Sequence, residues 1–182
     1  MFALPHGIDL VPSTAFGDGR HPTTRMCMQA VTAFAPELPF RMLDVGSGTG
    51  VLAILAAKLG ASAAIGVEID GPSNEVAEAN AAKNHVADRT SFGTAWPEGT
   101  FALVVANILE AVLVALREDV TSRVAEGGTL VLSGLVSTDV PSIVARYAPL
   151  LGGARPDVYQ REEWRTLVWR RTSRTSAPRS HG

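Results

Sequence analysis

Cysteine is almost absent from this chain of 182 residues, which contains Cys27 alone. A single cysteine excludes an internal disulfide and suits a protein that works in a reducing compartment. The first residues, Met1–His6, lack the basic flank and the long apolar core of a secretory signal. We therefore expect a cytoplasmic protein.

Long apolar runs are also missing. The most hydrophobic stretch, Phe101–Leu116, is interrupted by Asn107 and Glu110 and is too short to span a bilayer. With 46% hydrophobic residues, the chain can instead bury the core of one globular domain. We expect residues 1–171 to form that domain, with residues 1–20 as a leading loop segment, and we expect no membrane partner.

The chain has little net charge. A formal charge of -2 at pH 7 gives no global electrostatic case for nucleic acid, so no direct nucleic-acid site is predicted. The charge is uneven, because residues 161–182 hold six arginines against two glutamates. Residues 172–182, rich in Ser, Arg and Pro, are predicted to be a disordered tail. Its arginines are expected to be solvated, with at most a weak attraction for an acidic partner such as ribosomal RNA.

Glycines at alternate positions mark the most informative stretch of the sequence. Gly46, Gly48 and Gly50 follow an apolar run at Phe40–Val45 and precede an Ala-rich segment at 51–59. This order predicts a buried parallel strand, a tight turn and a helix lying on the sheet. Glycine is needed where the backbone takes a positive φ or where a ligand lies against bare main chain. We therefore expect a cofactor crevice at the carboxyl end of this strand.

The residues around the turn discriminate between cofactors. A dinucleotide fingerprint would have its third glycine where this chain has Val51, and a P-loop would have a lysine after the loop. Acidic residues occur instead: Asp44 ends the first strand, and Glu68-Ile69-Asp70 ends the second. A carboxylate there can accept the ribose hydroxyls of an adenosine cofactor. An acidic site without phosphate ligands suits the cationic S-adenosylmethionine; the alternative is a structural bend with solvated turn residues.

Further polar side chains are expected at the same edge of the sheet. Asn107 follows an apolar strand, where it contacts a ligand or simply caps the next helix. Thr24 closes the segment A-F-G-D-G-R-H-P-T-T, whose threonines are either ligand contacts or helix caps. His21 could accept a proton near neutral pH, although a hydrogen-bonded loop anchor is the favoured role. Trp96 could stack on an adenine, although packing against the neighbouring helix is favoured.

Strands and helices alternate along the rest of the chain. Apolar patterns predict strands at 64–69, 90–93, 101–106, 129–133, 154–160 and 164–170, helices at 22–35, 72–83, 109–124 and 141–151, and a strand fragment at 8–11. The last two strands are expected to pair as an antiparallel hairpin. The predicted fold is α/β: a Rossmann-like, doubly wound, mostly parallel seven-stranded sheet that ends in this hairpin.

Over about residues 11–171 the sequence resembles the catalytic domain of the bacterial ribosomal protein L11 methyltransferases, class I enzymes that use S-adenosylmethionine. The resemblance rests on the segment ending at Thr24, then L-D-V-G-S-G-T-G-V-L-A-I-L-A-A-K-L-G-A, G-V-E-I-D-G-P, A-N-I-L, G-G-T-L-V-L-S-G-L and a closing E-E-W. It implies a cofactor held by Thr24, Asp44, Gly46, Gly48, Glu68, Ile69 and Asn107, and no metal. It also implies methylation of lysine or N-terminal amines of a ribosomal protein, with Asn107 and Thr24 positioning the amine.

Some features depart from the family pattern. The family places a substrate-recognition domain ahead of this module, and we expect that domain to be absent here. Asp18 stands where the family usually has Thr, Glu68 where it has Asp, and His85 where it has Gly. We expect Glu68 to keep its acceptor role and His85 to affect only a helix end. The acceptor is therefore open: another protein or a small molecule is an alternative, and a NAD-dependent oxidoreductase, disfavoured by Val51, or an inactive binding module are others.

Overall fold

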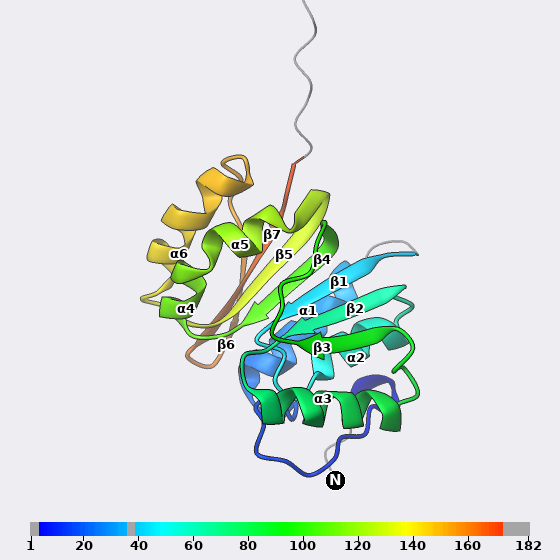
Figure 1. Cartoon of the computed structure of the whole chain (residues 1–182). Helices are drawn as coiled ribbons and strands as arrows, with labels where there is room; N and C mark the ends of the chain where they lie inside the picture. Colours follow the sequence, from blue (N-terminus) through cyan, green and yellow to red (C-terminus); the bar gives the residue numbers. More distant parts are fainter. Residues whose placement is uncertain (1–3, 36–38, 173–182) are drawn as a thin grey trace, which may run out of the picture.

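The computed structural model describes residues 4–35 and 39–172. Its strands form one seven-stranded sheet in the order β3-β2-β1-β4-β5-β7-β6 (Figure 1). The strands are Arg41–Val45 (β1), Ala63–Val67 (β2), Thr90–Gly93 (β3), Phe101–Asn107 (β4), Val124–Val136 (β5), Asp157–Arg161 (β6) and Trp164–Arg170 (β7). Neighbours among β1–β5 pair in parallel, and β7 is antiparallel to both β5 and β6. The predicted doubly wound sheet with a C-terminal antiparallel hairpin is confirmed.

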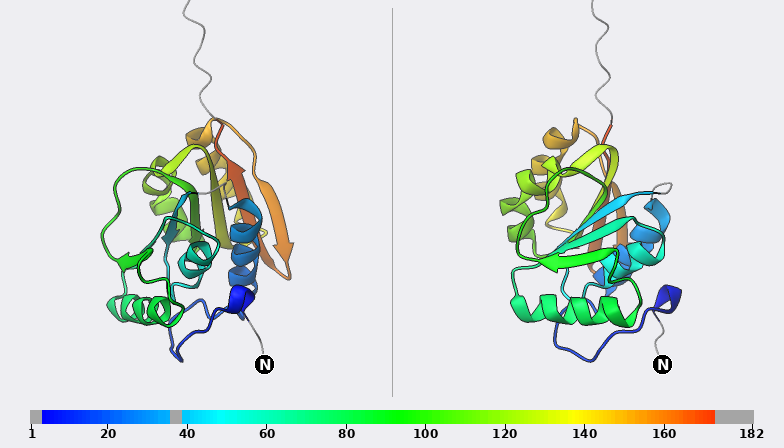
Figure 2. Two further views of the ribbon diagram at one scale, coloured as in Figure 1. Left: turned by 90° about the vertical axis from the view of Figure 1, so that its right-hand side faces the viewer. Right: turned by 45° about the vertical axis from the view of Figure 1, so that its right-hand side comes forward.

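Helices cover both faces of the sheet (Figures 1 and 2). One layer comprises α1 (Pro22–Phe34), α2 (Val51–Lys58) and α3 (Gly71–Lys83), and the other α4 (Glu110–Ala115), α5 (Arg117–Ser122) and α6 (Val140–Tyr147). Short 3₁₀ turns occur at Pro5–Gly7 (η1) and Ala148–Leu151 (η2). In the described part of the chain, no helix is long and apolar enough to cross a membrane.

The central strands are buried from both sides. Met42 of β1 packs into the core under α1 and α2, whereas the next residue, Leu43, packs into the core under α4, α5 and α6. Both side chains are fully buried. A strand covered on both faces has no solvent-facing side, and this is why its sequence is continuously apolar rather than alternating.

The strand register brings the predicted site residues together. Val45 of β1 pairs with Val67 of β2 and with Ala106 of β4. The next residue on each strand is a predicted site residue: Gly46, Glu68 and Asn107. From β1 the chain continues to β2 and β3 on one side of β1, and it then returns to form β4 on the other side. Ligands of open α/β sheets bind at such a switch point, where the strand order reverses.

The predicted helix at 109–124 is wrong in its extent. The chain forms two short helices, α4 and α5, that meet at Leu116, and Val124 already belongs to β5. The Phe101 amide donates to the Arg123 carbonyl, 2.8 Å away, so β4 pairs with this segment and draws it into the sheet. Gly127 and Gly128, which follow the predicted helix, lie inside β5, where the register between β4 and β5 shifts.

The predicted strand fragment at 8–11 is also wrong. The Asp9 and Val11 amides donate to the side-chain oxygens of Asn84 and Asn80, at 3.0 and 2.7 Å, rather than to a neighbouring strand. These asparagines belong to α3 and to its C-cap, so the N-terminal segment is held along the helix. His85, directly after the cap, has a left-handed backbone with φ of 58°, a conformation that explains why glycine is usual there.

Other element ends differ by a few residues. β2 ends at Val67, so Glu68 and Ile69 lie beyond the strand and on the turn toward α3. β6 begins at Asp157 rather than at 154. The predicted disordered tail falls almost entirely on residues 173–182, which lie outside the described residues.

Candidate functional site

A cavity of about 540 Å³ opens at the carboxyl ends of the parallel strands. Its walls come from the turns after β1, β2 and β4, from the 94–96 loop, from the segment before α1 and from the start of β7. The site residues predicted from the sequence that line it are Gly46, Gly48, Glu68, Ile69 and Asn107. Thr24 and Asp44 are not part of the lining.

The glycine turn has no room for side chains. Gly46 and Gly48 both have positive φ, 73° and 49°. A Cβ on Gly46 would overlap the Ile108 side chain, and a Cβ on Gly48 would overlap the Phe16 carbonyl oxygen. The turn therefore exposes main chain to the cavity while the N-terminal segment packs directly against it.

Glu68 faces the cavity with its carboxylate held in place. Oε2 accepts from the Gly48 amide at 3.2 Å, and Oε1 accepts from the Asp70 amide at 3.1 Å. Each oxygen keeps a further lone pair for a hydroxyl group. Asp70 has a structural role, because its Oδ2 accepts from the Ser73 amide at 2.9 Å and so caps α3.

Asp44 is an isolated buried carboxyl group. It is 1% exposed, and neither oxygen has a hydrogen-bond partner among the described residues. Burial raises the pKa of Asp44 to about 7 despite the opposing effect of the nearby Ala53 backbone, and the negative charge of Glu68 adds to the increase. The hydroxyls of Ser47 and Thr24 are buried without partners as well. Buried polar atoms without a partner in the chain are what a site for a polar ligand would show.

The rim of the cavity is apolar. Ile69 is 90% exposed and Leu109 is 72% exposed, and both line the cavity. Val112 and Phe16 are further exposed apolar residues on the same rim. Exposed apolar side chains gathered around one opening mark a surface for a ligand or partner.

The segment before α1 supplies the opposite wall. His21 is the N-cap of α1, and its Nδ1 lies 2.7 Å from Thr23 Oγ1. These contacts confirm the predicted loop-anchor role. Thr23, rather than Thr24, lines the cavity. Thr24 lies at the buried side of the helix, where its hydroxyl has no partner among the described residues.

Phe16 and Trp164 are wall residues that were not predicted as site residues. The His21 ring lies between them, with centroids 5.3 Å from Phe16 and 4.9 Å from Trp164, both edge to face. Trp164 begins β7, and it reaches this wall because β7 lies beside β5 in the sheet. The closing E-E-W motif was a signal for Trp164, and the phenylalanine of A-F-G was one for Phe16.

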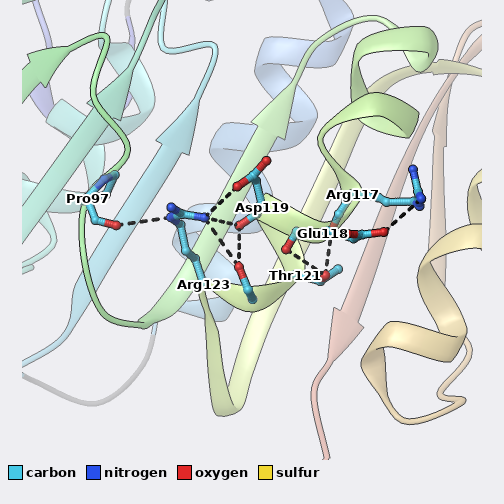
Figure 3. A network of polar contacts seen from close by, with 7 residues as sticks. Pro97, Arg117, Glu118, Asp119, Thr121 and Arg123 are labelled. Carbon is cyan, nitrogen blue, oxygen red and sulfur yellow. Dashed lines mark hydrogen bonds and ion pairs between the residues drawn. The ribbon is translucent and has the colours of Figure 1, made fainter.

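Trp96 lines the cavity and is also packed into the core under α4, α5 and α6. The Arg123 guanidinium lies 4.5 Å from the centre of its ring. Arg123 also donates to the Pro97 carbonyl at 3.2 Å and to Asp119 of α5, in a network that ties the 94–98 loop to this helix (Figure 3). Packing against the neighbouring helix, the favoured prediction, is thus observed. Because Trp96 also lines the cavity, it remains a candidate for contact with a ligand.

The cavity lining carries an acidic side chain but no basic Lys or Arg side chain. Among the described residues that line it, Glu68 is acidic and none is Lys or Arg. The described residues also contain no cluster of three or more His, Cys, Asp or Glu that could hold a metal ion. Such a lining offers no Lys or Arg side chain to pair with the phosphates of a dinucleotide.

Known proteins with similar sequences and structures share one description. The family model of ribosomal protein L11 methyltransferase (PrmA) matches residues 6–172. The ribosomal protein L11 methyltransferase of Ralstonia pickettii (strain 12J) is 43% identical over 141 residues, which cover 78% of this chain and 47% of that protein. That of Geobacter sp. (strain M21) is 40% identical over 172 residues, which cover 90% and 55%.

A solved structure agrees with these relatives. The crystal structure of ribosomal protein L11 methylase from Lactobacillus delbrueckii subsp. bulgaricus has a TM-score of 0.79 and 32% identity, covering 91% of this chain and 85% of that one. The chain spans about half the length of the curated relatives that it matches. With a family model matching nearly all of the described residues and this close structural likeness, the chain belongs to the ribosomal protein L11 methyltransferase family.

Proposed function

We propose that this chain binds S-adenosylmethionine and catalyses methyl transfer to amino groups of a protein, a ribosomal protein being the first candidate. The observation that carries the proposal is the Glu68 carboxylate, fixed by the Gly48 amide at the switch point of the sheet and facing a cavity lined by no Lys or Arg among the described residues. Family membership supports the protein acceptor, because the relatives are named for methylation of ribosomal protein L11. We also propose a cytoplasmic location, with no membrane or direct nucleic-acid partner.

The residues present fit this cofactor. Glu68 would accept the ribose hydroxyls, and the bare main chain at Gly46 and Gly48 would let the ligand approach closely. The buried oxygens of Asp44 and Thr24 have no hydrogen-bond partner among the described residues, so a donor group of the ligand would satisfy them if it reached them. When bound, the cofactor supplies an activated methyl group on a sulfonium. The remaining tasks of the chain are to align the acceptor and to exclude water.

The acceptor amine must be uncharged to react. Deprotonating a lysine of pKa near 10.4 costs about 4.6 kcal/mol at pH 7, whereas an α-amine near 7.8 costs about 1 kcal/mol. Asn107 is at the tip of β4 on the cavity wall, where its amide can hydrogen-bond a neutral amine. The apolar rim disfavours the charged form by desolvation. We propose Asn107 as the main positioning group, with Thr24 as the second one and no dedicated general base.

Calorimetry and label transfer test this function. We expect the purified chain to bind S-adenosylmethionine and not NAD, and to move labelled methyl onto protein in a ribosomal extract. Label appearing only on small molecules would instead favour the small-molecule acceptor. Binding without any transfer would indicate an inactive module, and binding of NAD alone would contradict the proposal.

Glu68→Gln tests the residue on which the proposal rests. The loss of a charged acceptor is expected to weaken donor binding roughly tenfold to a hundredfold. Glu75→Gln is the matched control, because Glu75 is an exposed residue of α3 outside the cavity lining. Unchanged donor affinity in Glu68→Gln would rule out its ribose role.

A further inference from the structure

β6 forms a free edge of the sheet. Within the described residues it pairs with β7 along one side and with no strand along the other, as Figure 2 shows for the orange strand in its left view. Its residues from Asp157 to Gln160 are exposed. A row of unpaired amides and carbonyls at such an edge is a template for another strand.

The hairpin geometry identifies the backbone groups that point outward. Glu162 and Glu163 make a two-residue turn between the paired residues Arg161 and Trp164. The pair that flanks such a turn is hydrogen-bonded, and hydrogen-bonded pairs alternate along an antiparallel ladder. Arg161, Tyr159 and Asp157 therefore direct their backbone groups to β7. Val158 and Gln160 direct theirs away from the sheet.

The charges along this edge are self-complementary. In an antiparallel pairing of two copies centred on Tyr159, residue positions that add up to 318 lie opposite each other. Asp157 then faces Arg161 of the other copy, and Val158 faces Gln160, the two residues with outward backbone groups. In the described part of the chain, neither Asp157 nor Arg161 takes part in an ion pair. Hydrogen bonding and charge thus select the same register.

Apolar surface lies on both faces of the strand. Val158 is 51% exposed and Tyr159 is 44% exposed. On the α1 face, the Tyr159 ring is 6.3 Å from the Phe34 ring. In the symmetric pairing, Tyr159 would lie opposite Tyr159 of the other copy, at the two-fold axis. The two ion pairs between Asp157 and Arg161 would lie on either side of it, on the same face of the sheet. Aromatic cross-strand pairs and pairs of opposite charge both stabilise adjacent strands.

We propose that β6 is a self-association surface through which two copies of this chain join their sheets edge to edge. The interface is isologous, because each copy contributes the same strand. A five-residue strand buries less area than a stable obligate dimer requires, so the association is reversible, with a dissociation constant in roughly the micromolar range or weaker. The proposal does not depend on methyl transfer, and its test needs no ligand.

Charge reversal with mixing tests the pairing. Asp157→Arg makes both ends of the edge positive, and Arg161→Asp makes both ends negative. Sedimentation velocity over a concentration series should show self-association of the natural chain. Each variant alone should associate at least roughly tenfold more weakly, and a one-to-one mixture should regain association, because each positive end then meets a negative one.

The mixture also controls for folding, since a variant that regains association with its complement is folded. Asp88→Arg, at an exposed residue outside β6, is the matched control for charge and should associate like the natural chain. A natural chain that stays monomeric at millimolar concentration would overturn the proposal. Variants that all associate equally would overturn it too.

A cysteine at the axis tests the register. Tyr159→Cys would place two thiols on directly opposed residues about 4.5 Å apart between Cα atoms, within the range for a disulfide. Cys27 is fully buried and burial raises its pKa to about 12, so it does not compete. Oxidation should give a covalent dimer with Tyr159→Cys and not with Thr138→Cys on an exposed loop. Equal cross-linking of both variants would contradict the register.

Discussion

The two ends of the cavity are built in different ways. One wall of the cavity, Gly46, Gly48, Glu68 and Ile69, comes from two turns that are close in the sequence; we propose that it holds the methyl donor and call it the donor end. The opposite wall, Phe16, His21, Thr23 and Trp164, combines the segment around the start of α1 with the start of the last strand; we propose that it faces the acceptor and call it the acceptor end. A donor shared by many reactions can be held by a compact motif, whereas a wall assembled from distant segments can change its acceptor without disturbing that motif.

Gly48→Ala should have the largest effect and should break the donor end. The new Cβ would overlap the Phe16 carbonyl, at a backbone conformation with φ of 49°. We expect donor affinity to fall by more than roughly tenfold and the free energy of unfolding to fall by about 2 kcal/mol or more. Calorimetry and denaturant unfolding measure the two. Gly71→Ala, with open space around its Cβ, is the control, and an equal loss there would contradict the explanation.

Asn107→Ala should show whether Asn107 acts on the acceptor or on the donor. If Asn107 positions the acceptor, turnover should fall roughly tenfold to a hundredfold while donor affinity changes little. Steady-state label transfer and donor calorimetry give the two numbers. Equal losses of turnover and donor affinity would make Asn107 a donor contact only. Asn107 would then belong to the donor end.

Asp44 should make stability fall as pH rises. An unfolded Asp44 loses its proton near pH 4, whereas burial keeps the folded carboxyl protonated up to about pH 7. Between these values the folded state binds more protons, so the free energy of unfolding should decrease by up to about 1.4 kcal/mol per pH unit. Denaturant titrations at several pH values measure this slope. Asp44→Asn should flatten it, and an unchanged slope would assign the pH dependence to other groups.

His85→Gly should have the smallest effect and should leave both ends unchanged. His85 has φ of 58° after the cap of α3, and relief of this left-handed conformation should raise the free energy of unfolding by about 1 kcal/mol. Thermal unfolding measures the gain. Donor affinity should stay unchanged, so it is the reference against which the losses in the other variants are compared. A loss of stability would mean that the imidazole makes a contact worth more than the strain.

The difference between the two ends also explains what the sequence could predict. The strand, the glycine turn and Glu68 are neighbours in sequence, and local apolar patterns with turn chemistry determine them. Trp164 reaches the cavity only because β7 inserts beside β5, a pairing between strands that are distant along the chain. Thr23 rather than Thr24 faces the cavity because of the rotation of α1, which a pair of adjacent threonines does not reveal.

The boundary at 109–124 shows another limit of local patterns. Leu109, Leu113 and Val120 have helical spacing, and helices do form around them. Their interruption and the early start of β5 follow from the bond between the Phe101 amide and the Arg123 carbonyl, a contact between neighbouring strands. Strand pairing between distant residues therefore outweighed the local helix propensity of this segment.

The register of β1 with β4 has a consequence for how the reaction could vary among relatives. Val45 is opposite Ala106, so Gly46 and Asn107 emerge from adjacent strands one hydrogen-bonded spacing apart, about 4.8 Å. If Gly46 contacts the donor and Asn107 the acceptor, as we propose, the distance between these two contacts is set by backbone geometry common to every parallel sheet. Changes in the surrounding loops could then alter which acceptor binds without changing that distance.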